Sequence, residues 1–296
     1  MPNAGPPAAS PVGVVIATRN RAASLAATLE RLTALPERPQ VLVVDNASTD
    51  GTRALLAERF PQVRLLGLPA NRGALARNDG ARALPARYIA FSDDDSWWAP
   101  GALSAAVDLM EADPSLGLIA ARTLVAPDQT PDPLNETLAS SPLGAAPGLP
   151  GPHVLGFLGC AAVARRTAFL DAGGYHPLLF FGAEETLLAY DLTAAGWRVC
   201  YAPQVTAVHQ PAHGPRPGRS TLVRRNEVLT AWLRRPLPVA FRDTWRLARD
   251  APRDRAAARA LGQLLPRLPL ALRARRPLPA DVERDVRRLE HAHGRP

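Results

Sequence analysis

Three consecutive carboxylates, Asp93, Asp94 and Asp95, follow an apolar stretch in YIAFSDDDSWWAP (88–100). Alternate side chains of an extended segment point to the same side, so we expect Asp93 and Asp95 to converge. Two convergent carboxylates repel each other unless a cation lies between them. Hard divalent cations such as magnesium and manganese prefer oxygen ligands and often share them with substrate phosphates. The alternative is a solvated acidic turn, or an N-cap for the helix expected at 100–110.

A second acidic cluster, Glu184 and Glu185, occurs in FFGAEETLLAYDL (180–192). Burial or a like-charged neighbour raises the pKa of a carboxylate, and these two acids are adjacent in the sequence. A helix N-terminus, whose dipole favours acidic residues, would also account for the pair. We expect Phe180 and Phe181 to pack beneath this pair.

The first hundred residues alternate between short apolar stretches and helical patterns. A continuous apolar stretch is typical of a strand that is buried on both faces. The alternation predicts an α/β fold with a doubly wound, mostly parallel sheet and helices on both faces. The expected strands are VGVVIAT (12–18), VLVVD (41–45), VRLLGL (63–68) and YIAFSD (88–93).

Polar residues follow all four expected strands. Ligands of such sheets bind beyond the carboxyl ends of the strands, so these residues mark the expected site. They are Thr18, Arg19 and Asn20 after the first strand, Asp45 and Asn46 after the second, Asn71 and Arg72 after the third, and Asp93 to Asp95 after the fourth.

Five segments, in this order and spacing, resemble bacterial family 2 glycosyltransferases with the GT-A fold, over about residues 11–210. The resemblance implies an inverting enzyme that moves a sugar from a nucleoside diphosphate, with UDP expected, to a hydroxyl of a glycan or lipid-linked acceptor. The segments are VVIATRNR (14–21), VLVVDNASTDGT (41–52), NRGALARNDGAR (71–82), YIAFSDDDSWWAPGAL (88–103) and GAEETLLAYDLTAAGW (182–197).

The resemblance also implies a nucleotide site. Thr18, Asp45 and Arg77 match positions that hold the base, and Asp45 would accept a hydrogen bond from a uracil-like ring nitrogen. The full set of implied nucleotide-binding residues is Thr18, Arg19, Asn20, Asp45, Asn46, Asn71, Arg77, Asp93 and Asp94.

The implied cofactor is a divalent metal, manganese or magnesium, which neutralises the leaving diphosphate. Asp95 matches the metal-ligating aspartate of the family's DxD motif, and Asp93 matches the acidic residue near the ribose and the metal. His209, at the end of VTAVHQ (205–210), matches a histidine that completes the metal or diphosphate site in several relatives. A structural role is the alternative for this lone histidine.

Glu185 matches the second member of the family's Glu-Asp pair, which is the general base, and Glu184 is its neighbour. One base and direct displacement imply inversion at the anomeric carbon. The chain departs from the family twice here: the base is usually Asp, and Leu187 and Asp191 stand where the commonest pattern has Asp and Arg.

Three further residues are candidates for contacts with the sugar or the acceptor. Trp97 and Trp98 carry aromatic faces that stack well on sugar rings, with core packing as the alternative. Gly159 lies in LGFLGCAAVARR (155–166), which resembles the segment that borders the donor sugar and the acceptor.

Two other functions remain open from the sequence. A sugar nucleotidyltransferase would also use a nucleotide fold and an Asp-bound metal, but it would carry a glycine-rich basic loop where this chain has TRNR (18–21). The departures at the base leave open a catalytically inactive nucleotide-sugar-binding protein of the same fold.

Charge divides the chain, whose formal net charge is +8 and whose 35 basic residues are all arginines. Residues 1–214 hold 15 Arg against 19 acids, whereas residues 215–296 hold 20 Arg against 8 acids. We therefore expect a GT-A catalytic domain at 1–214 and an Arg-rich helical C-terminal extension at 215–296. Arg, Trp and Leu on amphipathic helices suit an anionic membrane surface. The alternative is a solvated extension that packs on the catalytic domain, and the absence of nucleic-acid motifs argues against a nucleic-acid partner.

The remaining patterns concern location and loops. The apolar stretches are too short to span a bilayer, and the N-terminus lacks signal-peptide features, so we expect a cytoplasmic protein, peripheral on the inner face of the plasma membrane if the extension binds lipid. Cys160 and Cys200 are expected to be buried thiols. Residues 126–152, with seven Pro and three Gly, predict a long irregular loop.

Overall fold

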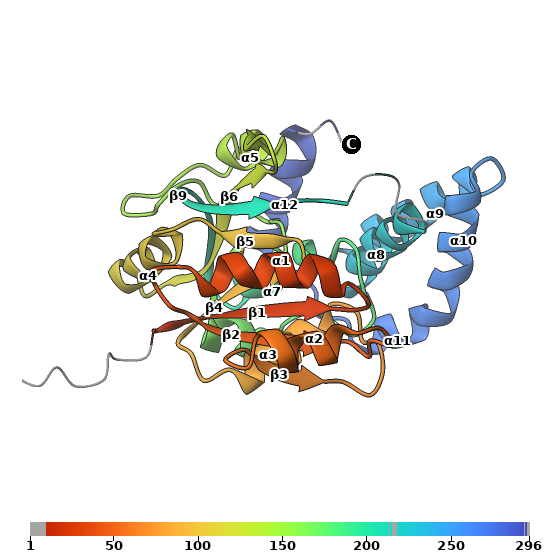
Figure 1. The fold of residues 1–296 in the computed structure, drawn as a ribbon. Helices are drawn as coiled ribbons and strands as arrows, with labels where there is room; N and C mark the ends of the chain where they lie inside the picture. Colours follow the sequence, from red (N-terminus) through yellow and green to blue (C-terminus); the bar gives the residue numbers. More distant parts are fainter. Residues whose placement is uncertain (1–9, 213, 215–217, 293, 295–296) are drawn as a thin grey trace, which may run out of the picture.

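The computed structural model describes residues 10–212, 214, 218–292 and 294. Within these residues, nine strands form one curled sheet that lies between two layers of helices (Figure 1). The strands are β1 (Val12–Thr18), β2 (Gln40–Asp45), β3 (Arg64–Gly67), β4 (Tyr88–Asp93), β5 (Ser96–Trp98), β6 (Leu116–Val125), β7 (Thr130–Pro131), β8 (Ala162–Arg165) and β9 (Arg198–His209).

Helices follow most of the strands and then form the end of the chain. The helices of the sheet region are α1 (Ala22–Thr33), α2 (Thr52–Arg59), α3 (Leu75–Ala83), α4 (Ala102–Ala112), α5 (Leu134–Ala139), α6 (Arg166–Asp171) and α7 (Glu184–Ala194). Those of the C-terminal part are α8 (Arg219–Arg234), α9 (Leu237–Asp250), α10 (Arg255–Leu264), the 3-10 turn η1 (Leu265–Arg267), α11 (Leu268–Arg273) and α12 (Ala280–Ala292).

The sheet order is β3-β2-β1-β4-β8-β6-β9-β5, with β7 paired to β6. The first four strands in this order are parallel, as the strand–helix alternation predicts. Strand β8 runs antiparallel between β4 and β6, and β9 runs parallel to β6, so most paired residues belong to parallel pairs. The predicted α/β class and mostly parallel sheet are confirmed.

Two apolar layers hold helices on the two faces of the sheet. Leu25, Leu29 and Leu32 of α1, spaced for one face of a helix, are fully buried against strand residues such as Val14 and Ile16. The opposite layer contains residues of α3, α6 and α7 packed on the other face of the same strands. Alternate side chains of one strand supply both layers, which is why the predicted strands are continuously apolar.

The predicted irregular loop at 126–152 contains two short regular elements, β7 and α5, and the prediction was wrong on this point. Asp132 accepts a hydrogen bond from the Leu134 backbone N–H at 2.9 Å in the turn before the helix. Asn135 bonds both the N–H and the C=O of Thr123, at 2.9 and 2.7 Å, which ties the helix to β6. These side-chain hydrogen bonds therefore outweigh the proline content of this segment.

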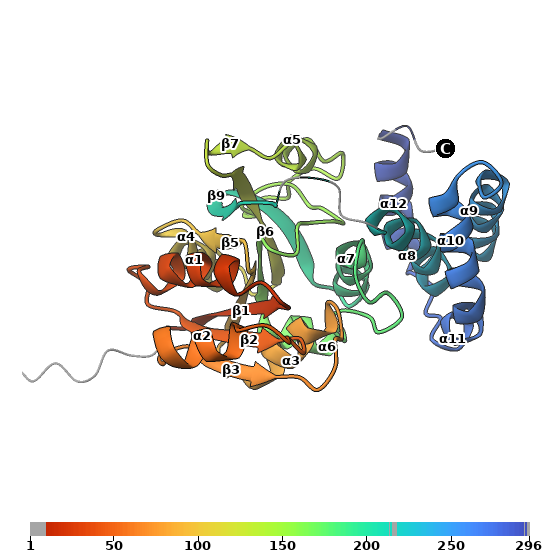
Figure 2. The ribbon, with the colours of Figure 1, turned by 45° about the vertical axis from the view of Figure 1, so that its right-hand side comes forward.

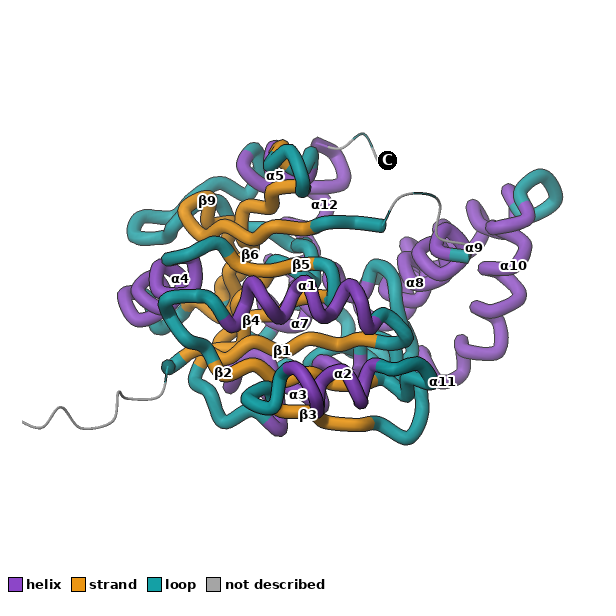
Figure 3. Tube along the Cα trace, in the orientation of Figure 1, coloured by secondary structure: helices purple, strands orange, loops and turns teal. Residues whose placement is uncertain are grey.

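Beyond β9 the described residues form only helices and loops (Figure 3), which confirms the C-terminal helical extension. This extension shares a core with the sheet region, because Leu179 and Leu187 pack in the same cluster as Leu229 and Leu233 of α8. Figure 2 shows α7 between the sheet and the C-terminal helices. The domain boundary at 214/215 stays a prediction. No described helix is long and apolar enough to cross a membrane. Both cysteines are free and buried, as predicted.

Two glycines in helices provide a test of the packing between α3 and the sheet. A Cβ at Gly80 would lie 2.4 Å from Val15 Cγ1, whereas a Cβ at Gly262 in α10 would meet nothing within 4 Å. We expect Gly80→Ala to lower the free energy of unfolding by about 1–2 kcal/mol through overpacking. Gly262→Ala should raise it by about 0.5–1 kcal/mol through helix propensity. Urea denaturation of both variants checks this, and equal effects would contradict the tight packing.

Candidate active site

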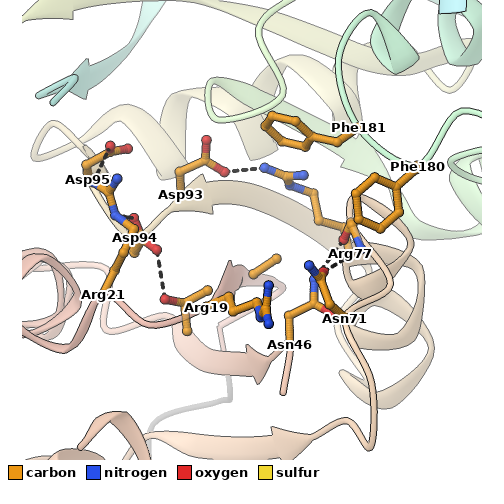
Figure 4. Close-up of a pocket in the computed structure, with 13 residues that line it drawn as sticks. Arg19, Arg21, Asn46, Asn71, Arg77, Asp93, Asp94, Asp95, Phe180 and Phe181 are labelled. Atoms are coloured by element: carbon orange, nitrogen blue, oxygen red, sulfur yellow. Dashed lines mark hydrogen bonds and ion pairs between the residues drawn. The ribbon is translucent and has the colours of Figure 1, made fainter. Parts of the chain in front are cut away.

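A pocket of about 320 Å3 lies at the carboxyl edge of the parallel strands (Figure 4). The register of the sheet builds it: Thr18 pairs with Asp45 across β1 and β2, and Ala17 pairs with Asp93 across β1 and β4. Residues far apart in the sequence therefore lie side by side. The lining residues are Ala17, Thr18, Arg19, Arg21, Asn46, Asn71, Gly73, Arg77, Asp93, Asp94, Asp95, Phe180 and Phe181.

Each carboxylate of the aspartate triplet has its own partners (Figure 4). Arg77 of α3 forms an ion pair with Asp93. Asp94 accepts a hydrogen bond from Thr18 Oγ1 at 2.7 Å and pairs with Arg21 Nε at 2.7 Å. Arg21 Nη2 also lies 2.8 Å from Asp95 Oδ2, so one guanidinium holds two of the three acids.

The turn after β4 directs Asp93 to Arg77 and Asp95 to Arg21. The expectation that Asp93 and Asp95 converge around one cation stays a prediction. Among the described residues, no group of three or more His, Cys, Asp or Glu side chains is arranged to hold a metal. The predicted metal set of Asp93, Asp95 and His209 is therefore not assembled as three protein ligands.

Asp94 is buried, with only 6% of the residue exposed, and this burial changes the pKa of its carboxyl. Desolvation raises the pKa of the Asp94 carboxyl to about 7, although the hydrogen bond from Thr18 and the charge of Arg21 oppose this rise. A neutral fraction of Asp94 at neutral pH reduces the repulsion within the triplet.

The pairing of β5 with β9 places His209 next to Asp95. Strand β5 pairs antiparallel with β9, and the register sets Ser96 opposite His209. His209 Nε2 consequently lies 3.5 Å from Asp95 Oδ1. The pair joins one nitrogen and one oxygen that are both suited to a divalent metal.

The predicted nucleotide-binding residues divide into two groups. Arg19, Asn46 and Asn71 line the pocket together with Thr18 and Arg77. Asn20 and Asp45 lie behind it and support the turn after β2.

Asn20 and Asp45 support this turn through hydrogen bonds to its backbone and to Arg53. Asn20 Oδ1 accepts from the Thr49 N–H at 2.7 Å, and the fully buried Asp45 carboxylate accepts from the Ser48 N–H at 3.0 Å and from Arg53 Nε at 2.5 Å. Burial on its own raises the pKa of Asp45, but the bonds from Ser48 and Arg53 lower it below its usual value.

The glutamate pair begins helix α7, close to the pocket. Glu184 is 2% exposed, and its Oε2 has no hydrogen-bond partner among the described residues. Glu185 is half-buried and accepts a hydrogen bond from the Gly159 backbone N–H. Burial raises the pKa of both carboxyls, and Arg77 opposes the rise.

Arg77 connects the two acidic clusters. Burial alone lowers the pKa of this guanidinium, but the charges of Asp93 and of the glutamate pair raise it above its usual value. Arg77 is only 5% exposed, so its charge is shared among neighbours in a poorly solvated place. The geometry therefore provides a pocket lined by both aspartates and arginines and, close to it, a glutamate pair whose pKa values are raised by burial.

The sequence model described as Glycosyl transferase family 2 matches residues 13–172, which is more than half of the chain. The chain belongs to this family. It is 28% identical to the N-acetylglucosaminyl-diphospho-decaprenol L-rhamnosyltransferase of Mycobacterium tuberculosis, over 76% of this chain and 87% of the relative. The predicted family and the prediction of a transferase are thereby confirmed.

Solved structures share the fold of this glycosyltransferase. A mannosyltransferase from Pyrobaculum calidifontis, in complex with GDP-Man and Mn2+, has a TM-score of 0.56 and 22% identity, and the match covers 97% of this chain and 76% of that one. Residues 1–349 of S. aureus TarS, in complex with UDP-GlcNAc, have a TM-score of 0.58 and 16% identity over 96% of this chain and 87% of that one.

The candidate sugar-binding residues do not gather at the pocket. Trp98 is 1% exposed and belongs to the core beneath β5. Trp97 packs under Arg31, whose guanidinium carbon lies 4.0 Å from the ring centroid. Gly159 lies at the glutamate pair, where a Cβ would come within 2.9 Å of Glu185 Oε1.

Phe180 and Phe181 line the pocket, which corrects the expectation that they pack beneath the glutamates. Phe180 is 38% exposed and has a φ of +65°. Its carbonyl accepts a hydrogen bond from the Ala74 N–H at 2.7 Å. Sequence reasoning also missed Arg21, for which the only signal was the second arginine of TRNR.

The C-terminal helices hold the segment that carries these phenylalanines. Asn226 of α8 is fully buried, and its Nδ2 contacts the carbonyl oxygens of Leu179, Phe181 and Gly182. Arg225 Nη2 donates a second hydrogen bond to the Leu179 carbonyl at 2.7 Å. The wall of the pocket therefore depends on a helix outside the sheet region.

Two glycines with positive φ test how tightly this wall is held. Gly73 has a φ of +58°, and a Cβ there would lie 2.2 Å from the Phe180 carbonyl oxygen. Gly101 has a φ of +83° with nothing near its Cβ position. We expect Gly101→Ala to cost about 1–2 kcal/mol of unfolding free energy, from backbone strain alone.

Gly73→Ala should cost more, and hydrogen exchange at residues 179–183 should accelerate only in this variant. Unchanged exchange there would show that the Gly73 contact does not hold the wall.

Proposed function

We propose that this glycosyltransferase moves a sugar from a nucleoside diphosphate sugar, with UDP as the nucleotide, to a hydroxyl of a lipid-linked glycan acceptor, with inversion at the anomeric carbon. The observation that supports it best is the arrangement around Arg77, which separates the aspartate pocket from the glutamate pair. A donor in the pocket and an acceptor beside Glu185 would meet at this position.

The nucleotide would lie along the carboxyl edge of β1, β2 and β4. Thr18, Arg19, Asn46 and Asn71 offer hydrogen bonds from the pocket walls, and Phe180 offers an aromatic face. Asp45 reaches a base only if the turn at 46–53 moves, because its carboxylate is fully buried and bonded to Arg53. Arg19 and Arg21 add positive charge for the diphosphate.

A divalent metal is part of the proposal, because Asp95, which lines the pocket, has an oxygen 3.5 Å from the Nε2 nitrogen of His209. Two protein ligands suffice for an ion that takes its other ligands from phosphates and water. Arg21 holds the second oxygen of Asp95 at 2.8 Å and so orients the carboxylate. When bound, the metal would neutralise charge on the leaving diphosphate.

Glu185 would be the general base. Its carboxylate is oriented by the Gly159 N–H, and burial raises its pKa, which makes it a better proton acceptor than an exposed glutamate. It would remove the proton of the acceptor hydroxyl as that oxygen attacks the anomeric carbon. Glu184, its buried neighbour, would limit water at the base, and burial beside Glu185 raises the pKa of Glu184 to about 8.

The acceptor class follows from the rhamnosyltransferase relative, whose name specifies a diphospho-decaprenol carrier. The Arg-rich C-terminal helices would suit such a carrier, since it resides in a membrane. A cytoplasmic location at the inner face of the plasma membrane is part of the same proposal.

Nucleotide binding tests the donor side. Calorimetry with UDP, GDP, dTDP and CDP, each with and without Mn2+, should show that UDP binds most tightly and that Mn2+ strengthens the binding. Asp95→Asn should lose at least tenfold of the metal-dependent affinity. Asp128→Asn, at an exposed aspartate outside the pocket, is the control and should bind like the unaltered protein. Binding that ignores both Mn2+ and Asp95 would contradict the metal assignment.

Turnover tests the base. Glu185→Gln should lower kcat by about 10²–10⁴-fold and leave UDP binding intact, because a positioned base contributes that much. The base works as a carboxylate and burial raises its pKa above 4.5, so kcat should rise with pH through a value higher than 4.5. Product analysis by NMR reports the anomeric configuration.

Exposed Glu136→Gln is the matched control for this substitution and should keep full activity. Release of pyrophosphate would instead indicate a nucleotidyltransferase. If the unaltered protein and Glu185→Gln both bind the nucleotide and neither turns over the donor, the chain would be an inactive binding protein.

A further inference from the structure

Helix α9 carries a line of exposed apolar side chains on its outer face. Leu237 is 44% exposed, Phe241 60% and Trp245 70%. Their spacing of four residues places them one above another along the helix. Single exposed apolar residues need no explanation, but two aromatic rings and a leucine in one line form a surface.

The opposite face of α9 fixes this line in place. Ala240 and Leu247 are buried in the core that α9 shares with α8 and α10. Trp232 Nε1 of α8 donates to Thr244 Oγ1 at 2.9 Å, and the rings of Trp232 and Phe241 meet edge to face with centroids 4.9 Å apart. The exposed rings therefore lie on a rigid support.

Arginines border the line on one side. Arg242, Arg246 and Arg249 have side chains that are 37%, 41% and 64% exposed. Asp243 and Asp250 balance part of this charge on the helix itself, but residues 215–296 as a whole hold 20 Arg against 8 acids. An apolar line beside a basic border matches the boundary between acyl chains and anionic headgroups.

The position of α9 leaves this face accessible within the described chain. In Figures 1 and 2, α9 and α10 lie at the end of the molecule away from the sheet, beyond α8. A second copy of the chain is a poorer match, because three side chains bury roughly 500 Å2 at most, below the ~800 Å2 per partner of stable interfaces.

We propose that the outer face of α9 docks on an anionic lipid bilayer, with Leu237, Phe241 and Trp245 entering the interface. Arg242, Arg246 and Arg249 then contact lipid phosphates. The use of this docking rests on the proposed function, since it would bring the catalytic pocket to a lipid-linked acceptor. The surface itself rests on the exposure of the apolar line and on the arginine excess of residues 215–296.

Vesicle sedimentation tests the docking. Vesicles of equal parts phosphatidylglycerol and phosphatidylcholine should bind the protein, vesicles of phosphatidylcholine alone should bind it much less, and added salt should weaken binding. The double variant Phe241→Ser, Trp245→Ser should lose about tenfold or more of the partition coefficient. Leu65→Ser is the matched control, because Leu65 is 42% exposed on the edge strand β3, and it should bind normally.

The single variant Trp245→Ser controls for a folding defect, because this side chain is mostly exposed and its loss should not affect folding. Its partition coefficient for anionic vesicles should fall at least threefold. Equal binding of all variants, or no binding to anionic vesicles, would overturn the proposal. A dimer that the double variant dissociates, without vesicle binding, would also overturn it in favour of an interface between copies.

The UDP calorimetry separates this proposal from the proposed function. Normal nucleotide binding in the double variant with lost vesicle binding supports both. Vesicle binding without nucleotide binding would leave the surface standing and remove the donor assignment.

Discussion

Two arginines keep a cluster of buried and half-buried carboxylates together, and the rest of the site depends on this balance. An unpaired buried charge costs several kcal/mol, so five acids near one sheet edge need compensation. Arg21 holds Asp94 and Asp95, while Arg77 holds Asp93 and faces the glutamate pair. A phosphate-bearing ligand entering this pocket meets carboxylates that are already partly neutralised. The arginines thus make an acidic pocket compatible with an anionic donor.

The sheet brings these groups together from two directions. Parallel strands β1, β2 and β4 end at one edge and supply the aspartates and their hydrogen-bonding neighbours. The long strand β9 returns to pair with β5 and sets His209 beside Asp95. One side of the pocket therefore forms from local strand–helix units, whereas His209 depends on contacts across more than a hundred residues.

The parts that followed from the sequence are those with a local physical cause. Continuous apolar stretches in a regular alternation indicated the buried parallel strands, and polar residues after them indicated the edge where Thr18, Asn46 and Asp93 meet. The partners of the triplet did not follow, because nothing local in the sequence sets Arg21, which precedes α1, or Arg77 of α3 against particular acids until the fold brings them together. Helix α5 was missed because one asparagine and one aspartate, Asn135 and Asp132, outweigh a high proline content. The sites of Trp97 and Trp98 depended on how β5 pairs, which no local pattern encodes.

Asn226 gives the C-terminal helices a part in the pocket, since its amide contacts three carbonyls of the segment before the glutamate pair. In evolutionary terms, the two parts of the chain are then a single unit of inheritance. A recombination event that joined the sheet region to the C-terminal helices of another protein would disrupt the core that Leu179 and Leu187 share with α8 and leave these carbonyls without their buried donor. Changes in the segment at 179–182 and in α8 must therefore be selected together, so the wall of the pocket would diverge through paired substitutions rather than by exchange of whole domains.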